Sequence, residues 1–147
     1  ADAEYHGAGG GLISTARDYL KFTRMILNGG TLNGARILRP ETVAMMASNQ
    51  VTMPAGRMVS NLPGFSSDFD LFPMMDCGWG LGFLINPVQG PDGRAPGSLA
   101  WAGIANSYYW IDPASDVTAV LCMQHLPFGE PLTVEVLRAV ERAVYQA

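Results

Sequence analysis

The spacing of apolar residues predicts three helices. Over residues 16–28, apolar residues recur three and four positions apart and form one face of a helix. Ser14 or Thr15 is suited to cap this helix, and the glycines that follow are suited to end it. A second helix is expected over 40–49, where Pro40 fits the first turn. A third apolar stripe runs through residues 133–144. Its polar side is expected to consist of Glu135, Arg138, Glu141 and Arg142.

Alternation with a period of two predicts strands between the second and third helices. In residues 78–85, bulky residues alternate with glycines up to position 82, which indicates a strand with one bare face that a helix or another backbone can approach. Further strands are expected at 98–103, 106–111 and 117–123. The turn at 112–116, with Pro113 at its second position, joins the last two as a hairpin. This order predicts a mixed α/β (α+β) fold in which an antiparallel sheet is flanked by helices.

The segment from residue 50 to residue 77 shows no period. Prolines and glycines interrupt it, yet it is rich in methionine and phenylalanine. Loops of this length are uncommon in compact domains and are often functional. Two interpretations stay open: the segment packs over the core, or it forms a wall of a substrate pocket.

The chain carries few charges for a domain of its size. Of its 147 residues, 48% are hydrophobic and only 15% are charged, against roughly 25% charged in a typical soluble domain. Either an apolar surface meets a partner or another subunit of an oligomer, or part of the fold is missing. The first residues, Ala1-Asp2-Ala3-Glu4, contain neither an initiator methionine nor a signal peptide, which favours the second interpretation and indicates no cellular compartment.

The net charge argues against a nucleic-acid partner, the hydropathy argues against a membrane span, and the position of the glycines argues against the common cofactor loops. A net charge of −4 and a pI near 4.9 do not suit nucleic acid, which requires a basic patch. No apolar run reaches the roughly 18 residues of a membrane-spanning helix. The glycines within residues 7–11 follow no strand, so no phosphate-binding or dinucleotide-binding loop is expected and no cofactor is indicated.

The cysteines and histidines do not form a recognisable site. Cys77 and Cys122 lack metal-ligand spacing and are expected to be two free thiols or one disulfide, with Cys122 in the core because its strand is apolar. The only histidines, His6 and His125, lie far apart in the sequence. Neither a metal site nor a triad that depends on histidine is therefore expected, and His125 is best explained as a loop residue.

Three blocks of sequence, followed by the third apolar stripe, carry a family resemblance. They are residues 9–19, 78–82 and 101–113. In this order they resemble the serine β-lactamase-like superfamily, and within it the class C-like (family VIII-type) esterases and the penicillin-binding-protein homologues. The resemblance covers the whole chain, residues 1–147, as the C-terminal part of such a hydrolase, and it implies the β-lactamase/transpeptidase-like fold.

The resemblance implies an active site built from three motifs, and this chain matches the third. Trp101-Ala102-Gly103 corresponds to the W-x-G form of a strand motif that is K-T-G in many lactamases. The S-x-x-K motif, which carries the nucleophile, has no match: Ser14 is followed by Arg17, which stays protonated and cannot act as a base, and the only lysine is Lys21. No tyrosine lies in the context of the second motif. The nucleophile is therefore expected in a missing N-terminal part, which becomes a partner of this chain.

The third motif implies an oxyanion site. The backbone N–H of Ile104, just after the motif, is expected to donate to the oxyanion that develops on the substrate, and Gly103 is expected to leave room for the substrate against the strand. Trp101 is either an apolar wall of the site or an aromatic residue packed in the sheet. Asn106 and Ser107 either contact the substrate or make hydrogen bonds within the turn and strand. The substrate-binding residues that the resemblance implies are thus Trp101, Ala102, Gly103, Asn106 and Ser107.

The implied reaction is acyl transfer from a small-molecule ester or amide to serine and then to water. Because Trp101 stands where K-T-G has a cation that can pair with a β-lactam carboxylate, neutral carboxylic esters are favoured over β-lactams. A β-lactamase or a peptidase for D-amino-acid substrates stays an alternative. So does a catalytically silent binding or interaction module, which is the behaviour expected of the isolated chain.

Overall fold

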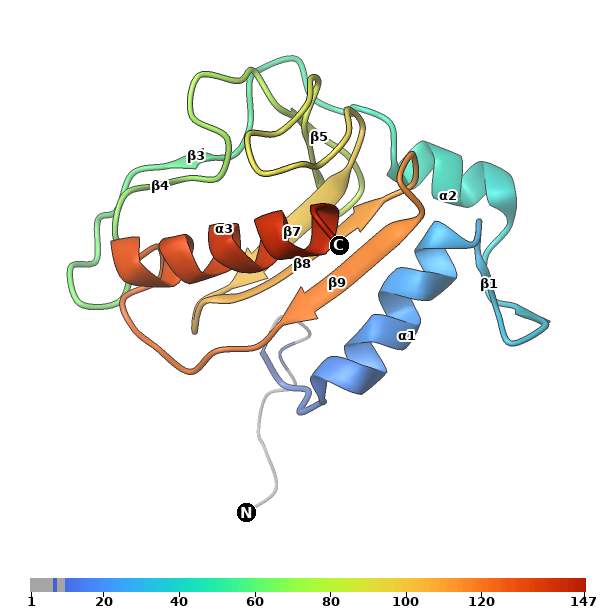
Figure 1. Ribbon diagram of the computed structural model, residues 1–147, viewed down its shortest axis with the longest axis horizontal. Coiled ribbons are helices and arrows are strands. Elements are labelled where there is room, and N and C mark those ends of the chain that lie inside the picture. Colours follow the sequence, from blue (N-terminus) through green and yellow to red (C-terminus); the bar gives the residue numbers. More distant parts are fainter. Residues whose placement is uncertain (1–6, 8–9) are drawn as a thin grey trace.

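A five-stranded antiparallel sheet forms the centre of the protein (Figure 1). The computed structural model describes residue 7 and residues 10–147. Across the sheet, the strands follow the order β5 (Gly78–Trp79), β6 (Leu84–Ile85), β7 (Leu99–Gly103), β8 (Ser107–Asp112) and β9 (Val117–Leu121). Two short hairpins lie outside it, β1 (Thr31–Leu32) with β2 (Ala35–Arg36), and β3 (Arg57–Met58) with β4 (Phe69–Asp70). The helices are α1 (Ala16–Leu27), α2 (Pro40–Met46) and α3 (Pro131–Tyr145), which confirms the expected mixed fold with an antiparallel sheet.

The sheet separates two apolar clusters. Neighbouring residues of a strand point to opposite faces, and in β7 the adjacent Leu99 and Ala100 belong to different clusters. The first cluster joins Ala100, Tyr108 and Trp110 to Leu137 of α3. The second joins Leu99 and Ile111 to Met25 and Ile26 of α1. The two helices therefore cover opposite faces of the sheet.

Helix α1 begins at the predicted residue, ends one residue earlier than predicted, and uses Thr15 of the two predicted caps. The hydroxyl oxygen of Thr15 accepts a hydrogen bond of 3.1 Å from the N–H of Asp18, which satisfies one of the free donors of the first turn. At the other end, Gly29 and Gly30 take positive φ values of 61° and 92°, which a helix cannot continue. The apolar side of the helix lies against β8 and β9.

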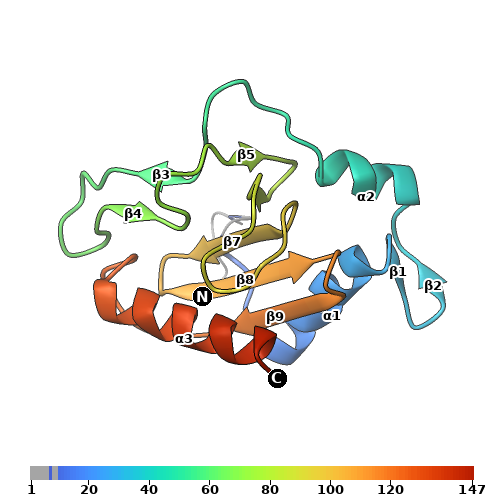
Figure 2. The ribbon, with the colours of Figure 1, turned by 45° about the horizontal axis from the view of Figure 1, so that its top comes forward.

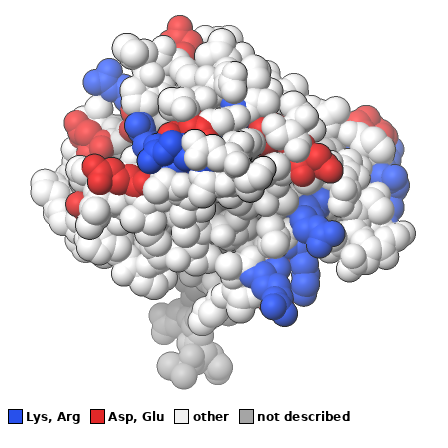
Figure 3. Space-filling model, in the orientation of Figure 1, with Lys and Arg blue, Asp and Glu red and all other residues white. Residues whose placement is uncertain are grey.

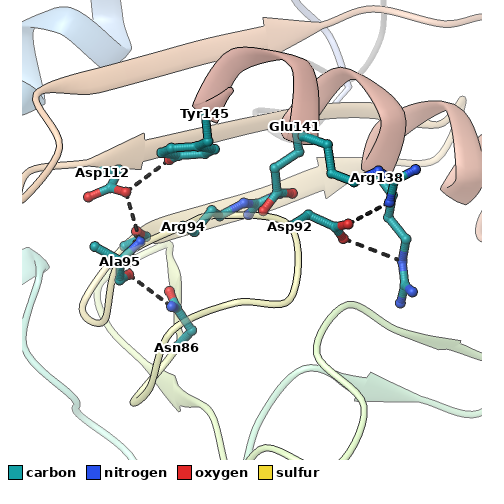
Figure 4. A network of polar contacts seen from close by, with 10 residues as sticks. Asn86, Asp92, Arg94, Ala95, Asp112, Arg138, Glu141 and Tyr145 are labelled. Carbon is teal, nitrogen blue, oxygen red and sulfur yellow. Dashed lines mark hydrogen bonds and ion pairs between the residues drawn. The ribbon is translucent and has the colours of Figure 1, made fainter. Parts of the chain in front are cut away.

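The polar side of α3 is only partly in water, and the prediction for Glu141 is wrong. The segment between β6 and β7 folds over α3 and brings the Arg94 guanidinium 2.6 Å from the Glu141 carboxylate, with both side chains at least 96% buried (Figure 4). The guanidinium also lies 4.8 Å from the Trp110 ring centre. Burial raises the pKa of Glu141 above its usual range, and the charge of Arg94 opposes that shift. A pattern of polar positions cannot reveal a partner 47 residues away.

Further polar contacts attach the same segment to the sheet and to α3. The carboxylate of Asp112 accepts hydrogen bonds from the Ala95 N–H at 2.8 Å and from the Tyr145 hydroxyl at 2.9 Å (Figure 4). Asp92 pairs with Arg142 at 2.5 Å. These bonds fix the connection that leads into β7.

The long segment between α2 and β5 was expected either to pack over the core or to form a wall of a substrate pocket. Its later part, residues 69–77, packs over the core. Figure 2 shows this segment lying above the sheet, with the short pair β3 and β4 within it. Its buried side chains belong to the cluster that contains Leu137: they are Phe69, Leu71, Phe72 and Cys77. Its prolines and glycines limit regular structure to two-residue strands.

Residues 78–85 form a hairpin rather than the single strand that the alternation predicts. The chain reverses after β5, because Gly82 adopts a φ of 94° and the N–H of Gly80 donates to the Phe83 carbonyl at 2.7 Å. The bare face is nevertheless used as expected, since a β-carbon on Gly80 would collide with the Met46 carbonyl oxygen. Helix α2 ends at Met46 instead of 49, because Asn49 turns the chain toward β5 by accepting a hydrogen bond of 3.0 Å from the Trp79 N–H.

The two cysteines are free thiols. Cys77 is buried as part of the core, and burial, together with Asp70 and Asp76, raises the pKa of its thiol to about 11. Cys122 is exposed, so its expected place in the core is wrong; it lies one residue beyond β9. Among the described helices, none is long and apolar enough to cross a membrane.

The surface carries few charges on the face that Figure 3 shows, and several large apolar side chains are exposed. Figure 3 shows broad uncharged areas between scattered groups of charged side chains. The most exposed large apolar side chains are those of Leu12, Ile13, Met53, Val59 and Met74. This agrees with the low charge content and leaves the expected contact with another segment or subunit as a prediction.

Candidate active site

The candidate oxyanion donor lies in the tight turn between β7 and β8. Gly103 ends β7, and its carbonyl accepts a hydrogen bond of 2.9 Å from the N–H of Asn106, which closes the turn. Ile104 lies at the tip with 64% of its surface exposed. Among the described residues, the N–H of Ile104 has no hydrogen-bond partner. The turn therefore contains a backbone donor that the described residues leave unbonded.

The strand that leads into this turn has an open edge. β6 pairs with β7 only at Leu84↔Ala100 and Ile85↔Leu99. In the part of the chain that the structure describes, residues 101–103 thus have a strand partner on the β8 side alone. A substrate can align along such an edge and make backbone hydrogen bonds to it.

Glycine at position 103 keeps the approach to this edge clear. A β-carbon built on Gly103 would meet only the Ser107 carbonyl oxygen, at 4.0 Å. Trp101, two residues earlier on the same face of β7, is half-buried and packs edge-on against Trp79 with ring centres 4.5 Å apart. Trp101 thus serves the packing of the sheet with part of its surface and leaves another part open.

A cavity of about 390 Å³ adjoins Gly103. Its walls come from the start of α1 and the ends of β7, β8 and β9, and they include Ala102, Gly103, Ser107, Tyr19, Val120 and Cys122. Neither these nor the other described residues of its wall carry a charged side chain. The cavity therefore suits a neutral group better than an ionic one.

Asn106 and Ser107 differ in what their side chains can reach. Asn106 has no exposed surface, and its amide is bonded entirely within the protein. Its side chain thus makes structural hydrogen bonds, but most of them reach residues 125–133 and not the turn and strand as expected. Ser107 lines the cavity, but its hydroxyl donates to the Met123 carbonyl at 3.2 Å. A substrate contact by Ser107 stays a prediction.

No described serine has an activating base. Ser14 lies at the cavity, before the first turn of α1, and the Lys21 ammonium pairs with Asp18 at 2.7 Å. The four described tyrosines lack the lowered pKa of a base: burial raises the pKa of Tyr19, Tyr108, Tyr109 and Tyr145. Tyr5, His6 and Gly9 lie outside the described residues. The described part of the chain also holds no cluster of three or more potential metal ligands.

Comparisons with known proteins identify the family of this chain. The family model "Beta-lactamase" matches residues 1–142. The chain belongs to the beta-lactamase family. Protein Rv1367c of Mycobacterium tuberculosis is 34% identical over 141 residues, which cover 90% of this chain and 32% of that protein. Monacolin J acid methylbutanoyltransferase of Aspergillus terreus is 26% identical over 151 residues, which cover 99% and 36%.

Two solved structures share the fold of this chain. Unliganded simvastatin synthase from Aspergillus terreus matches with a TM-score of 0.67 and 25% identity, over 86% of this chain and 33% of that one. A penicillin-binding-protein homologue from Caulobacter crescentus matches with a TM-score of 0.55 and 21% identity, over 86% and 30%. The chain spans about a third of the length of the relatives that it matches.

Two features of the site region were not found from the sequence. The buried amide of Asn106 and the pair of Arg94 with Glu141 each join segments far apart in the chain. For Asn106 a signal was present, because asparagine tolerates the left-handed conformation that a tight turn requires. For the ion pair there was none.

Proposed function

We propose that this chain supplies the oxyanion-binding strand and one wall of the active site of a serine hydrolase that cleaves neutral carboxylic esters. The observation that carries the proposal is the Ile104 N–H, which belongs to an exposed residue and has no partner among the described residues, beside the open edge of Gly103. The nucleophilic serine is assigned to a segment outside these 147 residues. The family and the one-third coverage of its members support this assignment.

In the proposed reaction, that serine attacks the ester carbonyl and its proton passes to a base in the same external segment. The carbonyl oxygen becomes an anion and accepts hydrogen bonds from the Ile104 N–H and from the N–H of the nucleophile. Collapse of this intermediate breaks the bond to the alcohol, which leaves with a proton, and an acyl-serine remains. Water then attacks the acyl-serine through the same oxyanion site and releases the carboxylic acid.

The uncharged cavity wall supports neutral substrates over β-lactams and over D-amino-acid peptides. A β-lactam carries a carboxylate that needs a cation or several donors when it is buried. Trp101 stands at the motif position of that cation, and the described cavity wall offers no other. The proposal therefore expects hydrolysis of a short-chain nitrophenyl ester at a rate well above that of a chromogenic cephalosporin.

An acyltransferase is a second candidate, because two of the relatives are named for acyl transfer or synthesis. The acyl-serine and the oxyanion site would be the same, and an alcohol would replace water as the acceptor. Adding a series of alcohols to the ester reaction and measuring the ratio of new ester to acid by mass spectrometry distinguishes the two. A dominant new ester would assign acyl transfer instead of hydrolysis.

The decisive test compares two substitutions at one position in the protein that carries both this chain and the nucleophile. Ile104→Pro removes the N–H, and Ile104→Ala removes only the exposed side chain. We expect Ile104→Pro to lower kcat by roughly 10²- to 10³-fold, the usual effect of losing one oxyanion donor, and Ile104→Ala to stay within a factor of about three. Equal turnover by the two variants would exclude the Ile104 N–H as a donor.

A further inference from the structure

The amide of Asn106 joins the candidate oxyanion turn to two other segments. Its side-chain N–H₂ donates to the carbonyls of His125 and Pro127, both at 2.9 Å. Its carbonyl oxygen accepts from the Gly129 N–H at 2.9 Å, the Thr133 hydroxyl at 3.0 Å and the Tyr108 hydroxyl at 2.8 Å. Both donors and the acceptor are thus fully used inside the protein.

The backbone alone does not require this side chain. Asn106 adopts a φ of 59°, in the left-handed region that glycine enters most easily and asparagine tolerates. A glycine would close the same turn without bringing a polar amide into the interior. A buried amide costs free energy unless it is bonded, so the five hydrogen bonds of Asn106 are a connection between segments and not a means of obtaining the turn.

Two other residues of this turn, Ala105 and Ser107, also bond to the segment that follows β9. The Ala105 carbonyl accepts from the His125 N–H at 3.2 Å, and the Ser107 hydroxyl bonds to Met123. Ile104 is exposed, and its N–H has no partner among the described residues. The direction of that N–H therefore depends on how firmly residues 105–107 are attached to the chain after β9.

We propose that Asn106 is a positioning residue of the oxyanion site: by tying the turn to residues 125–129 and to the start of α3, it holds the Ile104 N–H in the direction of the substrate. The inference rests on the proposed function for its catalytic consequence, but the restraint on the turn is independent of it. A donor that shifts by a fraction of an ångström at the moment of reaction loses most of its effect on the transition state.

The restraint is measured by hydrogen exchange in the protein that carries both this chain and the nucleophile. Asn106→Gly keeps the backbone conformation and removes the side-chain bonds, and Asn106→Asp keeps the shape but replaces the two donors by an acceptor that faces two carbonyls. Asn33→Gly is the matched control, because Asn33 also has a positive φ of 49° but is exposed and makes no described side-chain hydrogen bond. We expect exchange of the residue 106 amide, which closes the turn, to accelerate by about tenfold or more only in the position 106 variants, with Tyr109 in β8 unchanged.

The catalytic consequence is measured in the hydrolase, with active sites counted by a fluorophosphonate label. A purely structural role lowers the number of active sites, whereas a positioning role lowers kcat per labelled site. We expect Asn106→Gly to lower kcat per site by roughly 10- to 100-fold with KM within about twofold, a smaller effect than complete loss of the donor. Should Asn106→Asp fail to fold, Asn106→Gly decides alone.

Two outcomes separate the proposals. The positioning role is overturned if amide exchange at residue 106 is unchanged. It is also overturned if a folded Asn106→Gly variant keeps the parental kcat per site while Ile104→Pro lowers the turnover of the parent protein. Accelerated exchange together with equal turnover of Ile104→Pro and Ile104→Ala confirms the restraint and rejects the proposed oxyanion donor instead.

Discussion

Replacing Gly103 by valine is expected to remove most ester turnover while leaving the fold nearly as stable as before. The backbone at Gly103 is not left-handed, and a β-carbon there meets only the Ser107 carbonyl oxygen at 4.0 Å, so a side chain fits without strain. Valine also favours strands, on a propensity scale that spans about 1 kcal/mol. The structure therefore gives no reason for a large loss of stability.

The loss of turnover has two sources. The methyl groups of valine would enter the cavity of about 390 Å³ that Gly103 lines, where we place the approach of the substrate. They would also keep the substrate carbonyl away from the neighbouring Ile104 N–H. Loss of one such donor typically costs about 10²–10³ in turnover, or roughly 3–4 kcal/mol, and the added bulk increases that loss. Gly103→Ala adds only one carbon and is expected to fall between the parent and Gly103→Val.

The assay is hydrolysis of a nitrophenyl butyrate ester by the protein that carries this chain and its nucleophile, with the melting temperature of each variant recorded alongside. Ala35→Val is the control, because it adds the same methyl groups to an exposed strand residue remote from the site. Near-parental turnover by a folded Gly103→Val variant would show that Trp101-Ala102-Gly103 does not form the wall of the active site. If Ala35→Val lost as much turnover as Gly103→Val, the loss could not be attributed to the position of Gly103 beside the site.

Three further outcomes are expected. The isolated chain should not react with a fluorophosphonate probe, because no described serine has a base beside it; stoichiometric labelling seen by mass spectrometry would contradict this. Glu141→Leu should lower the free energy of unfolding in urea by about 3–5 kcal/mol by leaving Arg94 buried and unpaired, and Arg94→Met in the same chain should restore much of it. Burial alone raises the pKa of Asp112, but hydrogen bonds from Ala95, Ser115 and Tyr145 outweigh it and lower the pKa below its ordinary 3.8. Asp112 therefore stabilises the fold above pH 3.8, and this stabilisation is lost as the pH falls through the lowered pKa of the folded state. Asp112→Asn should therefore lower stability at pH 7 and flatten the decline below pH 4, and an unchanged urea midpoint at pH 7 would count against the role given to these bonds.

Local patterns were sufficient for the elements whose stabilising contacts are close in the sequence. The limits of α1 depend on Thr15, Asp18 and the two glycines after Asn28, all within one turn of the helix ends. The hairpin of β8 and β9 depends on the turn from Asp112 to Asp116. The W-x-G motif likewise placed Gly103 and Ile104 at a strand end, since that motif is itself a local pattern.

The sequence failed where a distant contact decides the structure. Alternation in residues 78–85 predicted one strand because glycine at an even position is equally suited to a bare strand face and to the reversal that Gly82 makes. Glu141 had the spacing of an exposed helix residue, and only the fold of the segment around Arg94 buries it. Cys122 had apolar neighbours, but its strand ends one residue earlier.

The turn after β7 depends on a local pattern and on distant contacts within four residues. The motif predicted that Gly103 and Ile104 lie at the end of a strand, which the structure shows. The partners of the Asn106 amide, in contrast, include Gly129 and Thr133, which are 23 and 27 residues further along the chain. Any residue that tolerates a positive φ would have fitted the pattern at position 106. An asparagine that is fully buried there, with its amide bonded at both ends, stabilises the attachment of the turn as well as its shape. Because the Ile104 N–H is oriented only through that turn, the same amide determines how firmly the turn is held and how precisely the proposed oxyanion site is aimed.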